Sequence, residues 1–481
     1  MNALRLLARK LACPAGLAAG LGGVVAIRVS QLHAGLLYPD GYQYLLMARG
    51  ISAHGRPLLR LGAGGDLFVP NLDASLKPLF PTLVAAAHLL GPDWLTAARA
   101  VTAVAGASTV ALCAALARRL TRSWTSGAVA GSICLASPSL AYWGGFVGPD
   151  ALAPALALAA ALALLDRRPA LGGALVAACI ATRPEYAALA LAAVPAPMLD
   201  RRARPALIRA ATTATFVLAL LLASVRPPLG VPDARLLIGG GVATALLGAL
   251  LVVTHRDTVP PAVWACAAAV GAATLAVVGV PGGFHHLLAS DWPLLIAAGA
   301  GFASALRYAP LRPTAVSLAL ATTVLAAVYF AKNPDLERYL SQLVVPLALI
   351  AALGATRLRT AVLFAPALAA LVLLPSTRPD PGTDAFAAAA PVLRQTRGTI
   401  VTAAPDAYGL LLYPRPVRAL RPGEYGLVVL DAAQRTFEPE LGVRGLVIRE
   451  VSAGDGLRRP DGRVDRKPTL LLRGSVVSRR N

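Results

Sequence analysis

The chain has 481 residues, of which 57% are hydrophobic and 14% are charged, whereas an ordinary soluble domain has about 25% charged residues. This composition excludes a disordered or collagen-like chain and a row of ordinary soluble domains, because a globule cannot hide so much apolar surface from water. The net charge of +21 would indicate nucleic-acid binding in a soluble protein, but in a membrane protein it can record topology alone.

Apolar runs that approach the 30 Å thickness of a bilayer core, roughly 20 helical residues, recur from the N-terminus to about residue 375. They predict an all-α polytopic membrane domain over residues 1–375. About 13 transmembrane helices are expected, at 11–30, 95–117, 125–141, 150–165, 170–183, 186–199, 207–225, 235–254, 260–280, 291–307, 313–330, 340–356 and 360–375. The pair of runs beside Arg183-Pro184-Glu185 fits either one broken helix or two helices joined by a tight turn.

The basic residues support this arrangement. If the N-terminus is cytoplasmic, alternate loops hold every basic cluster on one side, as the positive-inside rule requires. The clusters are Arg5, Arg9 and Lys10; Arg118, Arg119 and Arg122; Arg167 and Arg168; Arg201, Arg202, Arg204 and Arg209; Arg256; Arg307 and Arg312; Arg357 and Arg359. A cleaved signal peptide over Met1–Ala26 is the alternative for the first span. We therefore expect a multi-pass protein of the inner (plasma) membrane of a bacterium.

Two large elements then fall outside the cytoplasm. The first is the loop at about 31–94, which is far longer than a usual connection. The second is the tail at 376–481, where charges become frequent. Short β-rich runs at 398–403, 425–431, 442–451 and 469–477, with a helical stretch at 384–396, predict a small extracytoplasmic α/β domain.

The first outside loop carries the acid of greatest interest. Asp40 precedes a stretch with helical apolar spacing, which we expect to lie in the membrane interface with Tyr42 and Tyr44 at headgroup depth. Asp40 fits an N-cap of that helix, and it also fits a general base acting on a polar acceptor at the water–membrane boundary. Both can hold at once.

Further charged residues follow at predicted helix ends on the same side. They are Lys77, Asp150, Arg183, Glu185, His285 and Arg338. For any one of them, a structural ion pair or a side chain reaching for the interface is the plainer explanation. Their convergence on one face favours a functional site.

The order of several short motifs resembles the GT-C superfamily of polytopic glycosyltransferases, particularly bacterial relatives of protein O-mannosyltransferases and lipid A aminoarabinose transferases. The motifs are an acid after the first helix (Asp40), Lys77-Pro78-Leu79-Phe80-Pro81, Ala98-Arg99 opening a span, Asp150 heading the fourth, Arg183-Pro184-Glu185 after the fifth, and Arg338-Tyr339 before a late helix with Pro346. The resemblance covers roughly residues 1–375.

The resemblance implies a transferase for cell-envelope glycan biosynthesis that uses a polyprenyl-phosphate-linked sugar donor and inverts the anomeric carbon. Asp40 would deprotonate the hydroxyl of a glycan, lipid or protein acceptor, and Asp150 would orient the acceptor or the base. Lys77, Arg338 and Arg183 would bind the donor phosphate, with Tyr42, Tyr44, Glu185 and His285 as further contacts. No metal site is assigned. A divalent cation is an optional cofactor that His285-His286 could hold, although adjacent histidines are more often a loop feature.

Three alternatives remain open. A transporter or flippase of lipid-linked sugars would share the apolar helices and the interfacial arginines, although we find no inverted repeat. A non-catalytic membrane scaffold would leave Asp40 and Lys77 without a task. An oligosaccharyltransferase would normally need more than one acid in the first loop, where Asp40-Gly41-Tyr42 supplies one. No motif for nucleic-acid binding is present, and the partners expected are the donor, the acceptor and the lipid bilayer.

Overall fold

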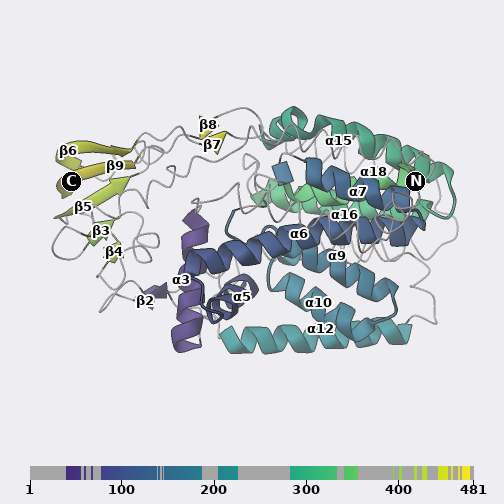
Figure 1. Cartoon of the computed structure of the whole chain (residues 1–481), viewed down its shortest axis with the longest axis horizontal. Helices are drawn as coiled ribbons and strands as arrows, with labels where there is room; N and C mark the ends of the chain where they lie inside the picture. Colours follow the sequence, from purple (N-terminus) through teal and green to yellow (C-terminus); the bar gives the residue numbers. More distant parts are fainter. Residues whose placement is uncertain are drawn as a thin grey trace, which may run out of the picture.

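A computed structural model describes the helical body and parts of the C-terminal region (Figure 1). The described residues are 39–55, 59–60, 67–68, 77–137, 139–140, 144, 146–186, 204–225, 282–332, 341–355, 394, 400–402, 417–419, 425–430, 443–452, 457–458, 464–465 and 469–476.

Most of the described residues lie in helices. These helices are α3 (Pro39–His54), α5 (Leu79–His88), α6 (Trp94–Thr121), α7 (Trp124–Ala136), α9 (Leu152–Leu165), α10 (Pro169–Ile180), α12 (Arg204–Val225), α15 (Gly282–Arg307), α16 (Arg312–Lys332) and α18 (Val344–Gly354), with 3-10 turns η1 (Pro184–Tyr186) and η4 (Ser341–Leu343). Every predicted span within the described residues coincides with a helix. The spans at 11–30, 186–199, 235–254, 260–280 and 360–375 lie outside the described residues, wholly or almost wholly.

The helices differ in length from the predicted spans. Within the described residues, α6, with 28 residues, is the one helix whose length and apolar composition suffice to cross a membrane. At 1.5 Å per residue, the 12 residues of α10 and the 14 of α9 extend only about 18–21 Å. Polar residues bound these two helices: Asp150 lies just before the start of α9, and Thr182 and Arg183 follow the end of α10.

Helix α6 belongs to two hydrophobic clusters, one along each half. Its N-terminal half, including Ala97 and Ala105, packs with α3 and α5. Its C-terminal half, including Cys113 and Leu116, packs with α7, α9 and α18. The boundary is marked by Thr109, whose hydroxyl donates to the carbonyl of Ala151 at 3.0 Å, just before α9 begins. The short helices therefore leave half of α6 free for the first loop to cover.

Two pairs of helices approach so closely that their glycines leave no room for a side chain. A Cβ on Gly173 of α10 would lie 2.1 Å from the carbonyl oxygen of Ala210 in α12. A Cβ on Gly301 of α15 would lie 2.4 Å from the carbonyl oxygen of Ile350 in α18. Small residues at such crossings are typical of helices that pack without a hydrophobic driving force between them.

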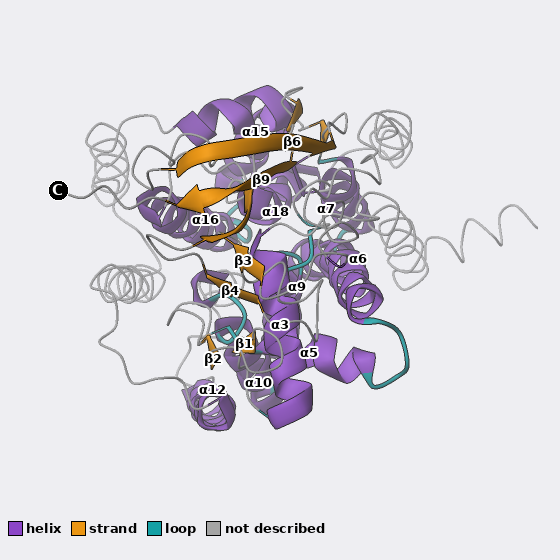
Figure 2. Cartoon of the chain, turned by 90° about the vertical axis from the view of Figure 1, so that its left-hand side faces the viewer, coloured by secondary structure: helices purple, strands orange, loops and turns teal. Residues whose placement is uncertain are grey.

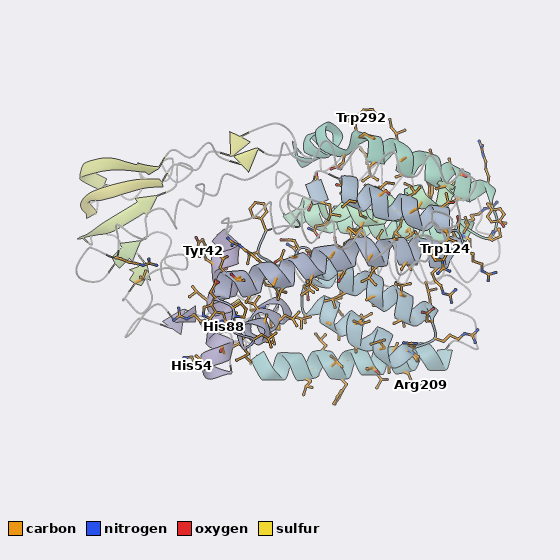
Figure 3. The ribbon with its side chains drawn as sticks, in the orientation of Figure 1. Tyr42, His54, His88, Trp124, Arg209 and Trp292 are labelled. Atoms are coloured by element: carbon orange, nitrogen blue, oxygen red, sulfur yellow. The ribbon has the colours of Figure 1, made fainter. Side chains whose placement is uncertain are left out.

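The basic turns gather at one end of the helical body. The C-terminal ends of α6 and α15 and the start of α12 lie at the end marked by Trp124 and Arg209, while Tyr42, His54 and His88 lie at the opposite end (Figure 3). Arg119 at the end of α6 contacts Asp166 at the end of α9. The described members of the predicted cytoplasmic clusters therefore share one end, as their alternation along the sequence predicted.

The C-terminal strands lie at the other end, with α3 (Figures 1 and 2). The C-terminal strands are β3 (Ile400–Thr402), β4 (Val417–Ala419), β5 (Tyr425–Leu430), β6 (Val443–Ser452), β7 (Leu457–Arg458), β8 (Val464–Asp465) and β9 (Thr469–Val476), whereas β1 (Leu59–Arg60) and β2 (Leu67–Phe68) belong to the first loop. Strands β5, β9 and β6 form an antiparallel sheet in that order, with β9 in the centre. Four of these strands fall on the four predicted β-rich runs; of the predicted helical stretch at 384–396, only Arg394 is described.

Candidate functional site

The first loop contributes helix α3, which crosses the direction of α6 (Figure 1). The helix begins at Pro39, a residue suited to a first helical position because its φ is already helical. Asp40 is therefore the second residue of the helix rather than its N-cap. A carboxylate in the first turn is favoured by the helix dipole.

Two tyrosines of α3 are placed differently from the prediction. Tyr42 is completely buried in protein and Tyr44 nearly so, whereas headgroup depth would require an exposed face. Tyr44 meets Phe80 of α5 edge to face, with ring centroids 5.6 Å apart. The apolar spacing of α3 is thus satisfied by α5 and α6 instead of by lipid, and both tyrosines belong to an apolar cluster that also includes Ala151, next to Asp150.

Lys77 comes from the segment that leads into α5, and it is almost fully buried. The amide of Leu79 donates to the carbonyl of Ala181 at 3.4 Å, which ties this segment to the end of α10. Because Arg183 follows Ala181 by two residues, the bond brings the Lys77 segment and the Arg183 segment together. An ammonium group in such a place is costly unless anionic or polar groups surround it.

Asp150, Arg183 and Glu185 form a buried charged cluster. Asp150 immediately precedes α9, and Arg183 and Glu185 follow α10, so the antiparallel packing of these helices brings their ends together. Asp150 Oδ1 accepts from Arg183 Nη2, and Glu185 Oε1 accepts from Arg183 Nη1 at 3.1 Å. All three side chains are at least nine-tenths buried. The cluster carries one net negative charge when all three groups are ionised.

This arrangement bears on the role expected for Arg183. A guanidinium that bridges two buried carboxylates has its charge balanced by them, which favours a structural and positioning role over phosphate binding. The ion pair foreseen as the plainer explanation of these residues is what the structure contains. Phosphate binding by Arg183 stays a prediction, and its surroundings do not favour it.

A second polar group links the site to α18. The hydroxyl of Tyr186 lies 2.7 Å from Gln342 Oε1 and 2.8 Å from the Gln342 carbonyl oxygen, so it donates to one of them. Gln342 Nε2 donates to Ser341 Oγ at 3.1 Å. All three residues are buried. Tyr186 immediately follows Glu185, so the turn that carries the charged cluster is anchored across the molecule.

Sequence reasoning missed this anchor and a buried acid in α15. Tyr186, Ser341 and Gln342 belong to no motif, and no signal in the sequence pairs them. Asp291 sits at a break in α15, where its backbone leaves the helical region two residues before Pro293. It is buried and accepts hydrogen bonds from Ser139 and Ser137. An acid beside a proline at the head of an apolar run was the signal that could have identified it.

The remaining predicted residues are placed only in part. His285 is the fourth residue of α15 and so lies in a helix, which corrects the reading of His285-His286 as a loop feature. Arg338 lies outside the described residues. Among the described side chains, no three of His, Cys, Asp and Glu lie close enough together to hold a metal ion. The described part of the site is therefore made of Lys77, the charged cluster and the turn of Tyr186.

Comparisons with known proteins support the fold. No protein-family model matches the sequence, and no curated protein matches it. The structure is similar to the crystal structure of ArnT from Cupriavidus metallidurans bound to undecaprenyl phosphate, with 12% identity, a TM-score of 0.50, and coverage of 95% of this chain and 97% of that one. It is also similar to the oligosaccharyltransferase of Archaeoglobus fulgidus in the apo form, with 13% identity, a TM-score of 0.56, and coverage of 88% and 70%.

Both neighbours belong to the GT-C superfamily. The resemblance predicted from the short motifs is thus confirmed at the level of the fold. The predicted count of membrane-spanning helices and the separate C-terminal domain stay predictions.

Proposed function

We propose that this chain is an integral-membrane glycosyltransferase that moves a sugar from a polyprenyl-phosphate donor to an acceptor hydroxyl on the extracytoplasmic face. The observation that carries the proposal is a GT-C fold in which Lys77 and the Asp150–Arg183–Glu185 cluster are buried, and in which the helix that begins with Pro39-Asp40 packs in one apolar cluster with Ala151, next to Asp150. Buried ionisable groups in an apolar helical body are costly and mark functional sites.

A membrane location follows from the outer faces of the helices. Large apolar side chains are exposed on α6, α12 and α15, namely Val104, Phe216, Leu220, Trp292 and Ile296, each at least half exposed. Trp292 on α15 is visible at the outer edge in Figure 3. A water-soluble surface rarely carries so much apolar area. We place the basic end of the body in the cytoplasm, and α3 and the C-terminal strands, as an α/β domain, outside it.

The donor follows from this location and from the fold. ArnT, which shares the fold, is bound to undecaprenyl phosphate in its crystal structure. A polyprenyl phosphate can reach the site laterally, with its tail between helices and its phosphate beside α5. Lys77 and Arg338 are the cations proposed to bind that phosphate, since a cation held out of water stabilises a phosphate leaving group more strongly than one in water.

The reaction requires one base. In the proposed step, Asp40 accepts the proton of the acceptor hydroxyl as the acceptor oxygen attacks the anomeric carbon. The bond from that carbon to the phosphate oxygen breaks on the opposite face, so the configuration inverts and polyprenyl phosphate leaves with the electron pair. Asp150 takes a positioning role through Arg183, because its carboxylate is engaged with the guanidinium.

The test replaces Asp40 by Asn and measures transfer from polyprenyl-phosphate sugars in membranes that contain the protein. We expect the rate of transfer to fall at least about 100-fold, because a general base usually contributes at least that factor to the rate. Insertion of the protein into the membrane should be unchanged. The matched control is Asp93→Asn, because Asp93 is an exposed N-cap of α6 at the same end, and Asn caps a helix as well as Asp does. Equal transfer by the two variants would remove Asp40 as the base.

The same membranes distinguish the transporter. A flippase would move the lipid-linked sugar across the bilayer without forming a new glycosidic bond. Neither the natural chain nor Asp40→Asn would then give a transfer product. A scaffold would neither move the sugar nor form the bond.

Transfer of a preassembled glycan is a second candidate, favoured by the similarity to the Archaeoglobus oligosaccharyltransferase. It would use the same base and the same leaving group, and it differs in the size of the donor. Supplying lipid-linked monosaccharide and lipid-linked oligosaccharide in parallel, and weighing the products by mass spectrometry, separates the two candidates.

A further inference from the structure

We infer that the two arginine-rich turns at the basic end of the helical body form a binding site for the headgroup of an anionic phospholipid. The first turn comprises the C-terminal end of α6, with Arg118 and Arg119, and the link to α7, with Arg122. The second joins α9 to α10 and holds Arg167 and Arg168. This site lies at the end of the body opposite α3 and depends on the proposed membrane location, but not on glycosyl transfer.

The two turns are in contact with each other. Arg119 Nε donates to Asp166 Oδ1 at 3.0 Å, and Arg119 Nη2 donates to the carbonyl of Leu165 at 3.2 Å. These contacts bring the end of α6 beside the end of α9. Around this contact stand five arginines and one aspartate, which leaves four net positive charges on two short turns.

The backbone of the turns is the second observation. Arg122 has φ of +56° and Arg167 has φ of +59°, and no other described residue apart from glycine has a positive φ. This left-handed conformation ends many helices, but glycine is the residue that adopts it without steric cost. Strained positions of this kind concentrate where a side chain has a task. Arginine, rather than glycine, occupies this conformation in two neighbouring turns. We take this as an indication that the positive charge of the two side chains is needed there for binding an anion.

A tryptophan completes the surface. The guanidinium carbon of Arg118 lies 3.5 Å from the centre of the Trp124 ring, and that ring remains partly exposed. Tryptophan is enriched at headgroup depth, where its apolar body meets lipid and its N–H meets polar groups. Basic groups between helix ends on the cytoplasmic side are the chemistry that holds anionic headgroups. The occupant that fits both features is a phosphodiester headgroup with its acyl chains beside α6 and α7.

The experiment uses the full chain purified in a neutral detergent. Phosphatidylglycerol or phosphatidylcholine with the same acyl chains is added in increasing amounts, and the midpoint of thermal unfolding gives the apparent affinity for each lipid. We expect phosphatidylglycerol to raise the midpoint well above the value with phosphatidylcholine. In the double variant Arg122→Gly with Arg167→Gly, the apparent affinity for phosphatidylglycerol should fall on the order of 30-fold, since each charge near a headgroup contributes about a factor of five.

The glycine variant is chosen because it should fold at least as stably as the natural chain, so that a lost response cannot be blamed on unfolding. The control is Arg122→Lys with Arg167→Lys, which keeps both charges and should keep most of the response. The inference is overturned if the glycine variant binds phosphatidylglycerol as tightly as the natural chain or if the lysine variant loses as much as the glycine variant. It is equally overturned if inorganic phosphate alone reproduces the shift.

Discussion

Helix α9 has an acid–arginine pair at each of its ends, and the two pairs differ in burial. At its start, Asp150 contacts Arg183 with side chains 0% and 5% exposed; at its end, Asp166 contacts Arg119 with side chains 51% and 47% exposed. Coulomb attraction between two ions rises as water is excluded, but so does the penalty for removing each ion from water. The buried pair therefore holds its two side chains in fixed positions and is costly to break. The exposed pair, made of the same two types of group, contributes little to stability.

The largest effect is expected when the buried pair is broken. Asp150→Asn leaves Arg183 with Glu185 as its one remaining described carboxylate, in surroundings that exclude water. We expect the free energy of unfolding to fall by about 3 kcal/mol, the usual cost of removing one partner of a buried pair. Thermal unfolding in detergent measures it. If the midpoint of thermal unfolding of this variant lies within about 1 °C of that of the natural chain, the two ends of α9 do not differ in the way proposed.

A matched variant separates stability from function in the same cluster. Replacing Asp150 by Asn, Arg183 by Met and Glu185 by Gln removes all three charges at similar volume. Such replacements often restore or raise stability. If stability returns while transfer stays lost, the charges serve the reaction. If the rate of transfer also recovers to that of the natural chain, the cluster serves only to stabilise the fold.

The sequence was sufficient for the helices but not for their lengths. Between Asp150 and Arg183 at their outer ends, the runs 150–165 and 170–183 are almost entirely apolar, and a helix that is apolar all round is expected to be buried in protein or lipid. Where the helix stops is decided by neighbours: α9 begins where the Ala151 carbonyl meets Thr109, 42 residues earlier in the chain. No local pattern contains that contact.

The sequence was sufficient to predict which residues belong to the site, but not which of them contact one another. Asp150 and Arg183 were foreseen on one face because antiparallel helices bring the start of one beside the end of the next. Tyr42 and Tyr44 were expected at the lipid interface because their spacing is amphipathic, and an amphipathic spacing does not say whether lipid or another helix covers the apolar side. Here α5 and α6 cover it. Tyr186 and Gln342 lie 156 residues apart and share no motif.

The anchor of the buried end should be the next most sensitive point. Tyr186→Phe keeps the ring in its buried place and removes the hydroxyl that donates to Gln342. We expect a loss of about 1–2 kcal/mol, since a buried acceptor is left without its donor. If the rate of transfer falls while most of the protein remains folded, the hydrogen bond of Tyr186 holds the turn that carries Glu185 in place for the reaction. A variant as stable and as active as the natural chain would show that the anchor is dispensable.

An exposed carboxylate at the same end should cost less. Asp93 caps α6 by accepting from the amides of Leu95 and Thr96, and Thr96 Oγ1 donates to it at 2.6 Å. We expect Asp93→Ala to cost about 1 kcal/mol and Asp93→Asn to cost little. A loss from Asp93→Ala that equals the loss from Asp150→Asn would mean that burial is not what distinguishes these acids.

The pH dependence of that cap has a definite sign. The hydroxyl and amide of Thr96 and the amide of Leu95 hold the pKa of the Asp93 carboxyl below its ordinary value of 3.8. A group whose pKa is lower in the folded state binds its proton more readily when unfolded, so its stabilisation is complete above pH 3.8 and is lost as pH falls through the lowered pKa. The stability difference between the natural chain and Asp93→Asn should therefore shrink below pH 3.8 and be constant at neutral pH.

The smallest effect is expected at the exposed end of α9. A double-mutant cycle with Arg119→Ala and Asp166→Ala should give a coupling energy below about 1 kcal/mol, because water screens both ions and two long side chains lose freedom when they pair. The carboxylate of Asp166 also sits at the C-terminal end of α9, where the helix dipole disfavours a negative charge. Removing Asp166 alone should therefore leave stability nearly unchanged at low salt, and the coupling should fade in about 1 M salt. A coupling of 3 kcal/mol that survives such salt would make the two ends of α9 equivalent, and would mean that the position of the pair along the helix, rather than its exclusion from water, sets its strength.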